Sequence, residues 1–158
     1  MKKFAKLSSV LGVTLLEIML VLAIAAMIIV MSIRYYQAAT SSQQANVVVQ
    51  KIAAIIAAAD SMSLSTGSYA GVTTNSIGGL LSNSGGLVTP WGTDITVVGG
   101  TTSYKVTIPD TPPSVCGILW GQLKGDQRVG SDLTECTSAT SPTNFVFTYN
   151  LLPQTKSP

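Results

Sequence analysis

Residues 13–33 read VTLLEIMLVLAIAAMIIVMSI, an apolar stretch in which Glu17 is the only charged residue. As an α-helix rising about 1.5 Å per residue, this stretch would be about 31 Å long, which matches the hydrocarbon core of a bilayer. Lys2, Lys3 and Lys6 precede it. A basic start followed by an apolar run is typical of an export or membrane-insertion signal. The stretch therefore predicts a membrane-inserted helix near the N-terminus.

The predicted helix continues well beyond this stretch. No glycine or proline lies between Val13 and Thr66, although the whole sequence contains 14 Gly and 7 Pro. These two residues are the least favourable in a helix interior, so their exclusion favours an unbroken helix. In its second half, apolar residues recur at steps of four and three and form one stripe: Val48, Ile52, Ile55, Ala59 and Met62. We predict one helix over residues 13–65, about 80 Å long, with Gly67 as its stop.

The remaining residues, 66–158, predict a globular head of the α+β class. Residues 66–86 are rich in Gly, Ser, Thr and Asn and indicate a long loop with one short element around 77–81. A β-hairpin is predicted over 95–98 and 103–108, around Gly99-Gly100.

A short helix and a closing strand complete the predicted head. Pro112-Pro113 is typical of a helix start. Gly125 is a plausible stop for this helix. Between them, apolar residues fall at helical spacing: Cys116, Leu119, Trp120 and Leu123. Residues 144–150, NFVFTYN, alternate apolar and polar residues as an outer strand would. We therefore expect a small antiparallel sheet with one helix packed on it.

The two cysteines, Cys116 and Cys136, have two alternative states. If the head lies outside the cytoplasm, a disulfide is expected. It would close a loop of about 21 residues and contribute about 3 kcal/mol in the loop-entropy model. It would also tie the short helix to residues 126–135. The other state is a pair of reduced, buried thiols.

Composition excludes several classes of function. The sequence has no histidine and only two cysteines, which excludes His-based triads, His-ligated zinc and four-thiolate metal sites. The formal net charge of +2 is too weak to predict nucleic-acid binding. Asp126, Asp132 and Glu135 lie near one another, but their spacing matches no Ca²⁺ loop, which favours a solvated acidic loop. We expect no enzymatic activity and no cofactor.

Glu17 is the most informative single residue. A carboxylate inside an apolar span costs about 2.5–3.5 kcal/mol, so it normally has a partner or a role. If the chain were cut after Gly12, the new amine of Val13 could pair with Glu17 of a neighbouring copy inside an apolar bundle. The alternative for Glu17 is a position close enough to the membrane edge to reach water. The alternative for the apolar stretch as a whole is a secretory peptide cut near Ala23-Ile24-Ala25.

The combination of Lys2-Lys3, Gly12, residues 13–17 and the apolar run resembles the prepilin signal of type IV pilins and related pseudopilins. The resemblance implies that residues 1–12 are a leader peptide, removed by prepilin peptidase after Gly12. It also implies that Val13 becomes the mature N-terminus, usually methylated by the same enzyme, and that Glu17 aligns subunits during assembly. The helix would then pack in a filament core, with residues 13–33 spanning the membrane beforehand.

The head resembles that of type IVb pilins. The carrying features are Thr89-Pro90-Trp91-Gly92 before a hairpin, the proline-rich turn before the Cys116 helix, and the closing Cys136. The start at Val13 rather than Phe, and the absence of proline before Pro90, favour the same subclass. The leader is shorter than many type IVb leaders. Trp91 itself is predicted to be a core-packing residue.

The function implied by the resemblance is that of a structural subunit, major or minor, of a type IV pilus. The expected partners are other copies of the chain, the inner membrane before assembly, prepilin peptidase, and an assembly machinery with its own ATPase, because the sequence has no P-loop. The head would be periplasmic first and extracellular after assembly. The alternatives are a pseudopilin of a type II secretion system and a single-span membrane protein whose periplasmic head binds a ligand.

Overall fold

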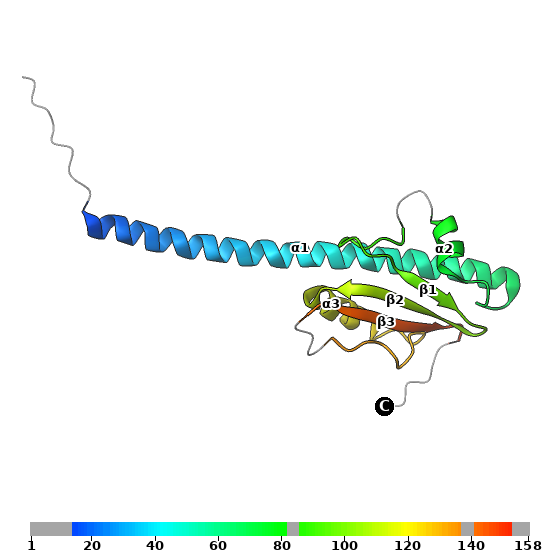
Figure 1. The fold of residues 1–158 in the computed structure, drawn as a ribbon. Helices are drawn as coiled ribbons and strands as arrows, with labels where there is room; N and C mark the ends of the chain where they lie inside the picture. The colour runs from blue at the N-terminus through cyan, green and yellow to red at the C-terminus, as the bar shows by residue number, and fades with distance from the viewer. Residues whose placement is uncertain (1–13, 82–85, 137–140, 153–158) are drawn as a thin grey trace, which may run out of the picture. The chain divides into compact units, whose positions relative to one another are not determined.

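A computed structural model describes residues 14–81, 86–136 and 141–152 (Figure 1). The chain divides into two compact units, which we call the N-terminal unit (residues 1–39) and the head unit (residues 40–158). The elements, in chain order, are α1 (Leu15–Thr66), α2 (Thr74–Leu80), β1 (Thr96–Gly99), β2 (Ser103–Thr111), α3 (Pro113–Leu123) and β3 (Thr143–Asn150). The α+β class and the long N-terminal helix are as predicted.

Helix α1 has 52 residues and both of its ends have a local cause. At the start, the backbone N–H of Glu17 donates to the carbonyl and hydroxyl oxygens of Thr14 at 3.0 and 3.3 Å. At the end, Gly67 adopts a left-handed φ of 72°, and its N–H donates to the Ser63 carbonyl at 2.7 Å. Glycine is favoured at this position because it has no Cβ to clash. The predicted glycine stop is confirmed.

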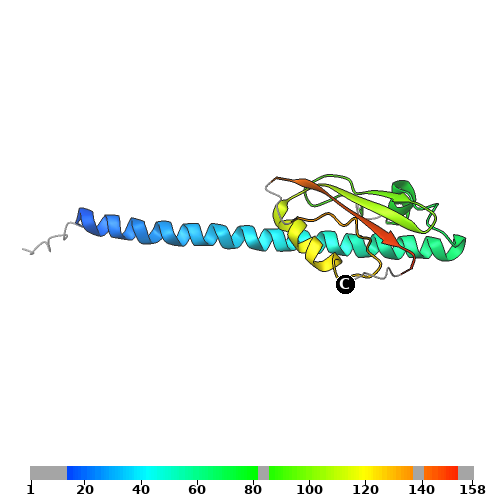
Figure 2. The ribbon, with the colours of Figure 1, turned by 90° about the horizontal axis from the view of Figure 1, so that it is seen from below.

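In the head unit, α1 contributes one buried stripe to the core. Its buried residues are Ala45, Val48, Ile52, Ile55, Ala59 and Ser63. Four of the five predicted stripe residues are among them, while Met62 is only partly buried because the neighbouring Ser63 turns inward instead. The stripe forms a single core cluster with the buried side chains of the sheet. Figure 2 shows the strands lying alongside this part of the helix.

The sheet has three antiparallel strands in the order β1-β2-β3, so the predicted hairpin and closing strand are confirmed. Alternate residues of its strands are buried: Val97, Tyr104, Val106, Ile108, Phe145, Phe147 and Tyr149. Strand β2 runs three residues past its predicted end at Ile108. Pro109 and Asp110 suggested a strand end, but Asp110 takes a φ of 51° in an irregularity of the ladder, and Thr111 then pairs with Thr143. Asp tolerates this left-handed conformation better than most residues.

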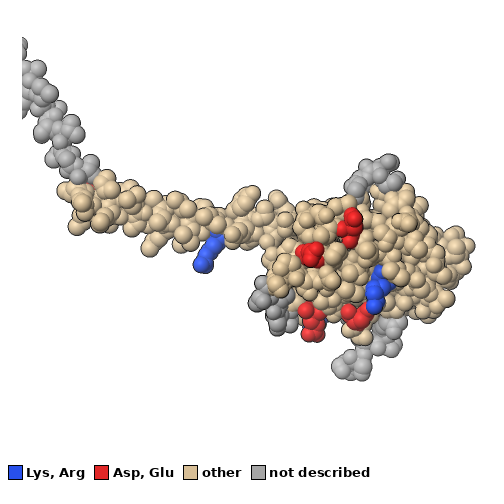
Figure 3. Space-filling model, in the orientation of Figure 1, with Lys and Arg blue, Asp and Glu red and all other residues tan. Residues whose placement is uncertain are grey.

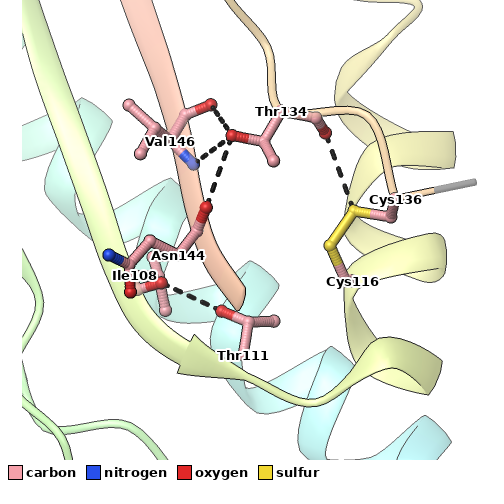
Figure 4. The surroundings of a disulfide bond; sticks show 7 residues. All are labelled: Ile108, Thr111, Cys116, Thr134, Cys136, Asn144 and Val146. Carbon is pink, nitrogen blue, oxygen red and sulfur yellow. Dashed lines mark hydrogen bonds between the residues drawn. A yellow bond between two sulfur atoms is a disulfide. The ribbon is translucent and has the colours of Figure 1, made fainter. Parts of the chain in front are cut away.

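Helix α3 begins after Pro112, as predicted, and buries Val115, Cys116 and Leu119 in the same core. Cys116 and Cys136 form a disulfide with their Cα atoms 5.6 Å apart, which confirms the predicted pairing (Figure 4). The disulfide therefore ties α3 to the segment that precedes β3.

The residues just before Cys136, 128–134, cover the outer edge of β3. Backbone bonds run from the Asn150 N–H to the Arg128 carbonyl (2.8 Å), from Gly130 to Thr148 (2.8 Å) and from Thr134 to Val146 (2.9 Å). The remaining outward amides, of Thr148 and Val146, donate to the side chains of Asp132 (3.2 Å) and Thr134 (2.8 Å). The Thr134 contacts appear in Figure 4. The outward amides of Val146, Thr148 and Asn150 are thus occupied.

The outer edge of β1 is covered as well. The N–H groups of Gly99, Val97 and Ile95 donate to the Val72 carbonyl (2.7 Å), the Thr74 hydroxyl (2.9 Å) and the Leu87 carbonyl (2.7 Å). A Cβ at Gly99 would overlap the carbonyl oxygens of Tyr69 and Val72. Gly99 is therefore a strand residue that permits close backbone approach, in addition to lying next to the hairpin turn.

Candidate functional site

The N-terminal unit presents an apolar helix that the other described residues leave uncovered. Between Leu15 and Ile33 the large apolar side chains are exposed, from 49% for Ile18 to 75% for Leu15 and Leu16. A contiguous apolar surface of this extent is unusual for a soluble monomer and marks contact with lipid or with another protein. We therefore describe this surface as an association surface for lipid or for another protein.

Helix α1 is also the one helix among the described residues that is long and apolar enough to cross a membrane, and none of its most apolar window is buried. It is compatible with a single-pass membrane protein.

Charge is nearly absent from this surface. Glu17 and Arg34 are the only charged residues from 14 to 39, and both are exposed. Figure 3 shows how few charged side chains the visible face of this helix carries. Among the described residues an ion pair joins Asp60 to Arg128, whereas neither Glu17 nor Arg34 has an ion-pair partner there. The predicted processing residues, Gly12 and Val13, lie outside the described residues.

The head unit contains a polar cluster that the sequence did not indicate. The Arg128 guanidinium binds both carboxylate oxygens of Asp60 in α1, at 3.0 and 3.1 Å, and its Nε donates to the Asn150 carbonyl at 3.0 Å. The Tyr69 hydroxyl donates to the same carboxylate at 2.5 Å and accepts from Arg128 at 2.8 Å. This cluster joins the helix to the end of β3.

Three tyrosine rings surround the cluster. Tyr104 contacts Tyr69 and Tyr149 with ring centroids 4.9 and 5.5 Å apart, and the Arg128 guanidinium lies 4.5 Å from the Tyr149 ring. Burial raises the pKa of the Tyr104 hydroxyl. Burial also raises the pKa of Tyr69, as does its hydrogen bond to Asp60. The tyrosines therefore stay neutral and act through packing and hydrogen bonding.

The Asp60 carboxyl responds to two opposing effects. Partial burial raises its pKa, but the hydrogen bonds from Arg128 and Tyr69 and the guanidinium charge outweigh burial and lower the pKa below its ordinary value. The charged form of Asp60 is therefore favoured in the folded head unit, which makes the cluster a source of stability that acid removes.

We predict that Asp60→Asn lowers the free energy of unfolding at pH 7 by about 1–2 kcal/mol, because it removes the charge that holds Arg128 at a partly exposed site. The pKa of Asp60 is lower folded than unfolded, so its contribution is present above about pH 4 and is lost as pH falls through the folded value. Urea unfolding between pH 7 and pH 3 measures both effects. Asp94→Asn, at an exposed site, is the matched control, and an equal loss in both variants would contradict the prediction.

The acidic residues near the C-terminus serve loop structure. Asp126 accepts a hydrogen bond from the Arg128 N–H at 2.8 Å, and Asp132 accepts from the N–H and hydroxyl of Thr148 at 3.2 and 2.5 Å. No group of three His, Cys, Asp or Glu able to hold a metal ion occurs among the described residues.

Trp91 is partly buried against the core, and its ring N–H donates to the Pro109 carbonyl at 2.9 Å.

Comparisons of the chain with protein-family models, with curated proteins and with solved structures find no match.

Proposed function

We propose that the chain is a structural subunit of an extracellular filament of the type IV pilus class, which polymerises through the N-terminal unit. The observation that carries the proposal is the exposed apolar helix with its single carboxylate, Glu17. Such a surface needs lipid or protein to cover it, and a filament core supplies protein on every side.

The same helix would use both environments in turn. Before assembly it would lie in the inner membrane, and in the filament it would exchange lipid contacts for close packing between helices. Small residues favour that packing because they let helix backbones approach. The alanines of α1 within the N-terminal unit are Ala23, Ala25, Ala26, Ala38 and Ala39. The energy for extraction would come from a separate ATPase.

The head unit has features that suit this role. A disulfide between Cys116 and Cys136 is typical of exported domains. Both outer strands of the sheet already have hydrogen-bond partners within the chain, so strand addition does not compete with assembly through α1. These features suit a subunit that is exported and assembles through its N-terminal helix.

The mature N-terminus tests the proposal most directly. We expect the full chain, expressed with prepilin peptidase, to begin at Val13 with a methylated amine, and to begin at Met1 without the enzyme. Intact-mass and N-terminal peptide spectra give the result. An uncut N-terminus at Met1 both with and without prepilin peptidase would contradict the proposal and favour a single-span membrane protein with a ligand-binding head.

Electron microscopy of the same cells separates the related filament classes. We expect long surface filaments that contain this chain. A short periplasmic structure, dependent on a type II secretion system, would instead identify a pseudopilin. A low copy number confined to filament tips would identify a minor pilin.

A further inference from the structure

Glu17 and Arg34 are positioned so that they cannot meet within one chain. They lie 17 residues apart on the continuous helix α1. At about 1.5 Å and about 100° per residue, this places them about 25 Å apart along the helix axis and about 100° apart around it. Neither side chain is long enough to bridge that separation. Any ion pair between them must join two copies of the chain.

The axial separation decides which copies can pair. In two parallel helices at the same depth, Glu17 lies level with Glu17 and Arg34 with Arg34. Opposite charges are then too far apart to pair. If one helix is displaced by about 25 Å along its axis, its Arg34 comes level with the Glu17 of the other, or the reverse. Copies in a membrane share one depth, whereas copies in a filament are staggered.

The axial and angular separations together decide what kind of assembly results. A copy whose Glu17 receives an Arg34 from a neighbour displaced in one direction offers its own Arg34 to a second neighbour displaced in the opposite direction, and the angle of about 100° places these two neighbours on different sides of the helix. Such a contact is heterologous, and repeated heterologous contacts produce an open helical filament rather than a closed dimer.

We propose that Glu17 of one copy forms an ion pair with Arg34 of a second copy displaced by about 25 Å along the helix axis, and that this pair fixes the axial stagger of the filament. The inference rests on the proposed function and names the partner of Glu17. Tyr35 and Tyr36, 80% and 70% exposed beside Arg34, would exclude water from the pair when a neighbouring helix covers them. Arg34 carries its positive charge whether or not the chain is cut at Gly12, unlike the amine of Val13.

The first test exchanges the two charges. Each variant is expressed as the full chain in a host in which the unaltered chain assembles into filaments. We expect Glu17→Gln and Arg34→Gln each to lower the amount of sheared filament protein by at least about tenfold relative to processed protein in the membrane, because each leaves one charge unpaired in an apolar core. Glu17→Arg combined with Arg34→Glu should restore filaments above either single variant. Lys105→Gln, which removes an exposed positive charge from β2, is the matched control and should have no effect.

Cross-linking is the second test and does not depend on the exchanged variant entering the membrane. Copies with Glu17→Cys and copies with Arg34→Cys are expressed together at low level with an excess of the unaltered chain, which sustains assembly, and the resulting filaments are oxidised. We expect disulfide-linked dimers on non-reducing gels. Copies with Ser32→Cys in place of Arg34→Cys present the thiol on another side of the helix and should give few dimers.

The outcomes separate this inference from the function on which it rests. Normal filaments from Arg34→Gln, or equal cross-linking from the Ser32→Cys copies, would overturn the ion pair and leave the proposed function standing. Absence of filaments from the unaltered chain in a host with the complete assembly machinery would overturn both. Loss of filaments from both single variants together with selective cross-linking would support the pair.

Discussion

Replacing Gly99 with alanine is expected to remove about 3 kcal/mol or more from the free energy of unfolding of the head unit. The added methyl group would overlap the carbonyl oxygens of Tyr69 and Val72, which are backbone atoms and cannot rotate away as a side chain could. To make room, β1 must separate from residues 69–72 and lose the bond from the Gly99 N–H to Val72. Domains of this size are stable by only about 5–15 kcal/mol, so the loss is a large fraction of the total.

Urea unfolding of the full chain in a mild detergent measures this effect. The two tryptophans, Trp91 and Trp120, both lie in the head unit, so their fluorescence reports on that unit alone. Gly121→Ala is the matched control, because its Cβ would meet no atom within 4 Å and it lies inside α3. Alanine should stabilise the helix there by about 0.5–1 kcal/mol. Similar unfolding midpoints for the two variants would show that the close approach at Gly99 is wrong.

Removing the disulfide is the second change with a large expected effect. We predict that Cys116→Ala combined with Cys136→Ala lowers the free energy of unfolding by about 3 kcal/mol, because the loop that the disulfide closes regains its freedom in the unfolded chain. The double variant avoids a lone reactive thiol. The measurement is the same urea titration, with the unaltered chain in its oxidised form as reference. A loss below about 1 kcal/mol would contradict the loop-entropy account.

The same double variant should loosen one edge of the sheet in particular. Residues 128–134 cover β3 and are tied to α3 through Cys136. We expect faster hydrogen exchange at the amides of Val146, Thr148 and Asn150, which donate to that segment. The intervening amides of β3 face β2 and serve as internal controls. Equal acceleration at both sets would mean that the disulfide stabilises the whole sheet rather than its edge.

Local pattern was sufficient to predict most elements of the fold. The absence of glycine and proline predicted α1, and the apolar stripe from Val48 to Ala59 identified the face that packs on the sheet. The paired prolines predicted the start of α3, and alternation predicted β3. Each of these signals depends on residues within a few positions of one another, which is where sequence patterns carry information.

The contacts between distant segments could not be predicted in the same way. Asp60 and Arg128 are 68 residues apart, and nothing in the surrounding sequence of either distinguishes it from an exposed charge. The irregular end of β2 depends on Asp110, which in isolation favours a turn, and on pairing with Thr143. Glu17 was prominent because its charge lies in an apolar stretch. Arg34 gained significance from the unbroken helix, which fixes its distance and angle from Glu17.

The covered edges of the sheet have a consequence for how this chain can change over generations. Since outward amides of β1 and β3 have hydrogen-bond partners within each copy, the edges of the sheet are not needed to join one subunit to the next in the proposed filament. Substitutions that keep the core and these edge contacts would leave both edges closed to strand addition. Lineages could therefore vary the outward side chains of the sheet without opening an edge to unwanted strand pairing between copies.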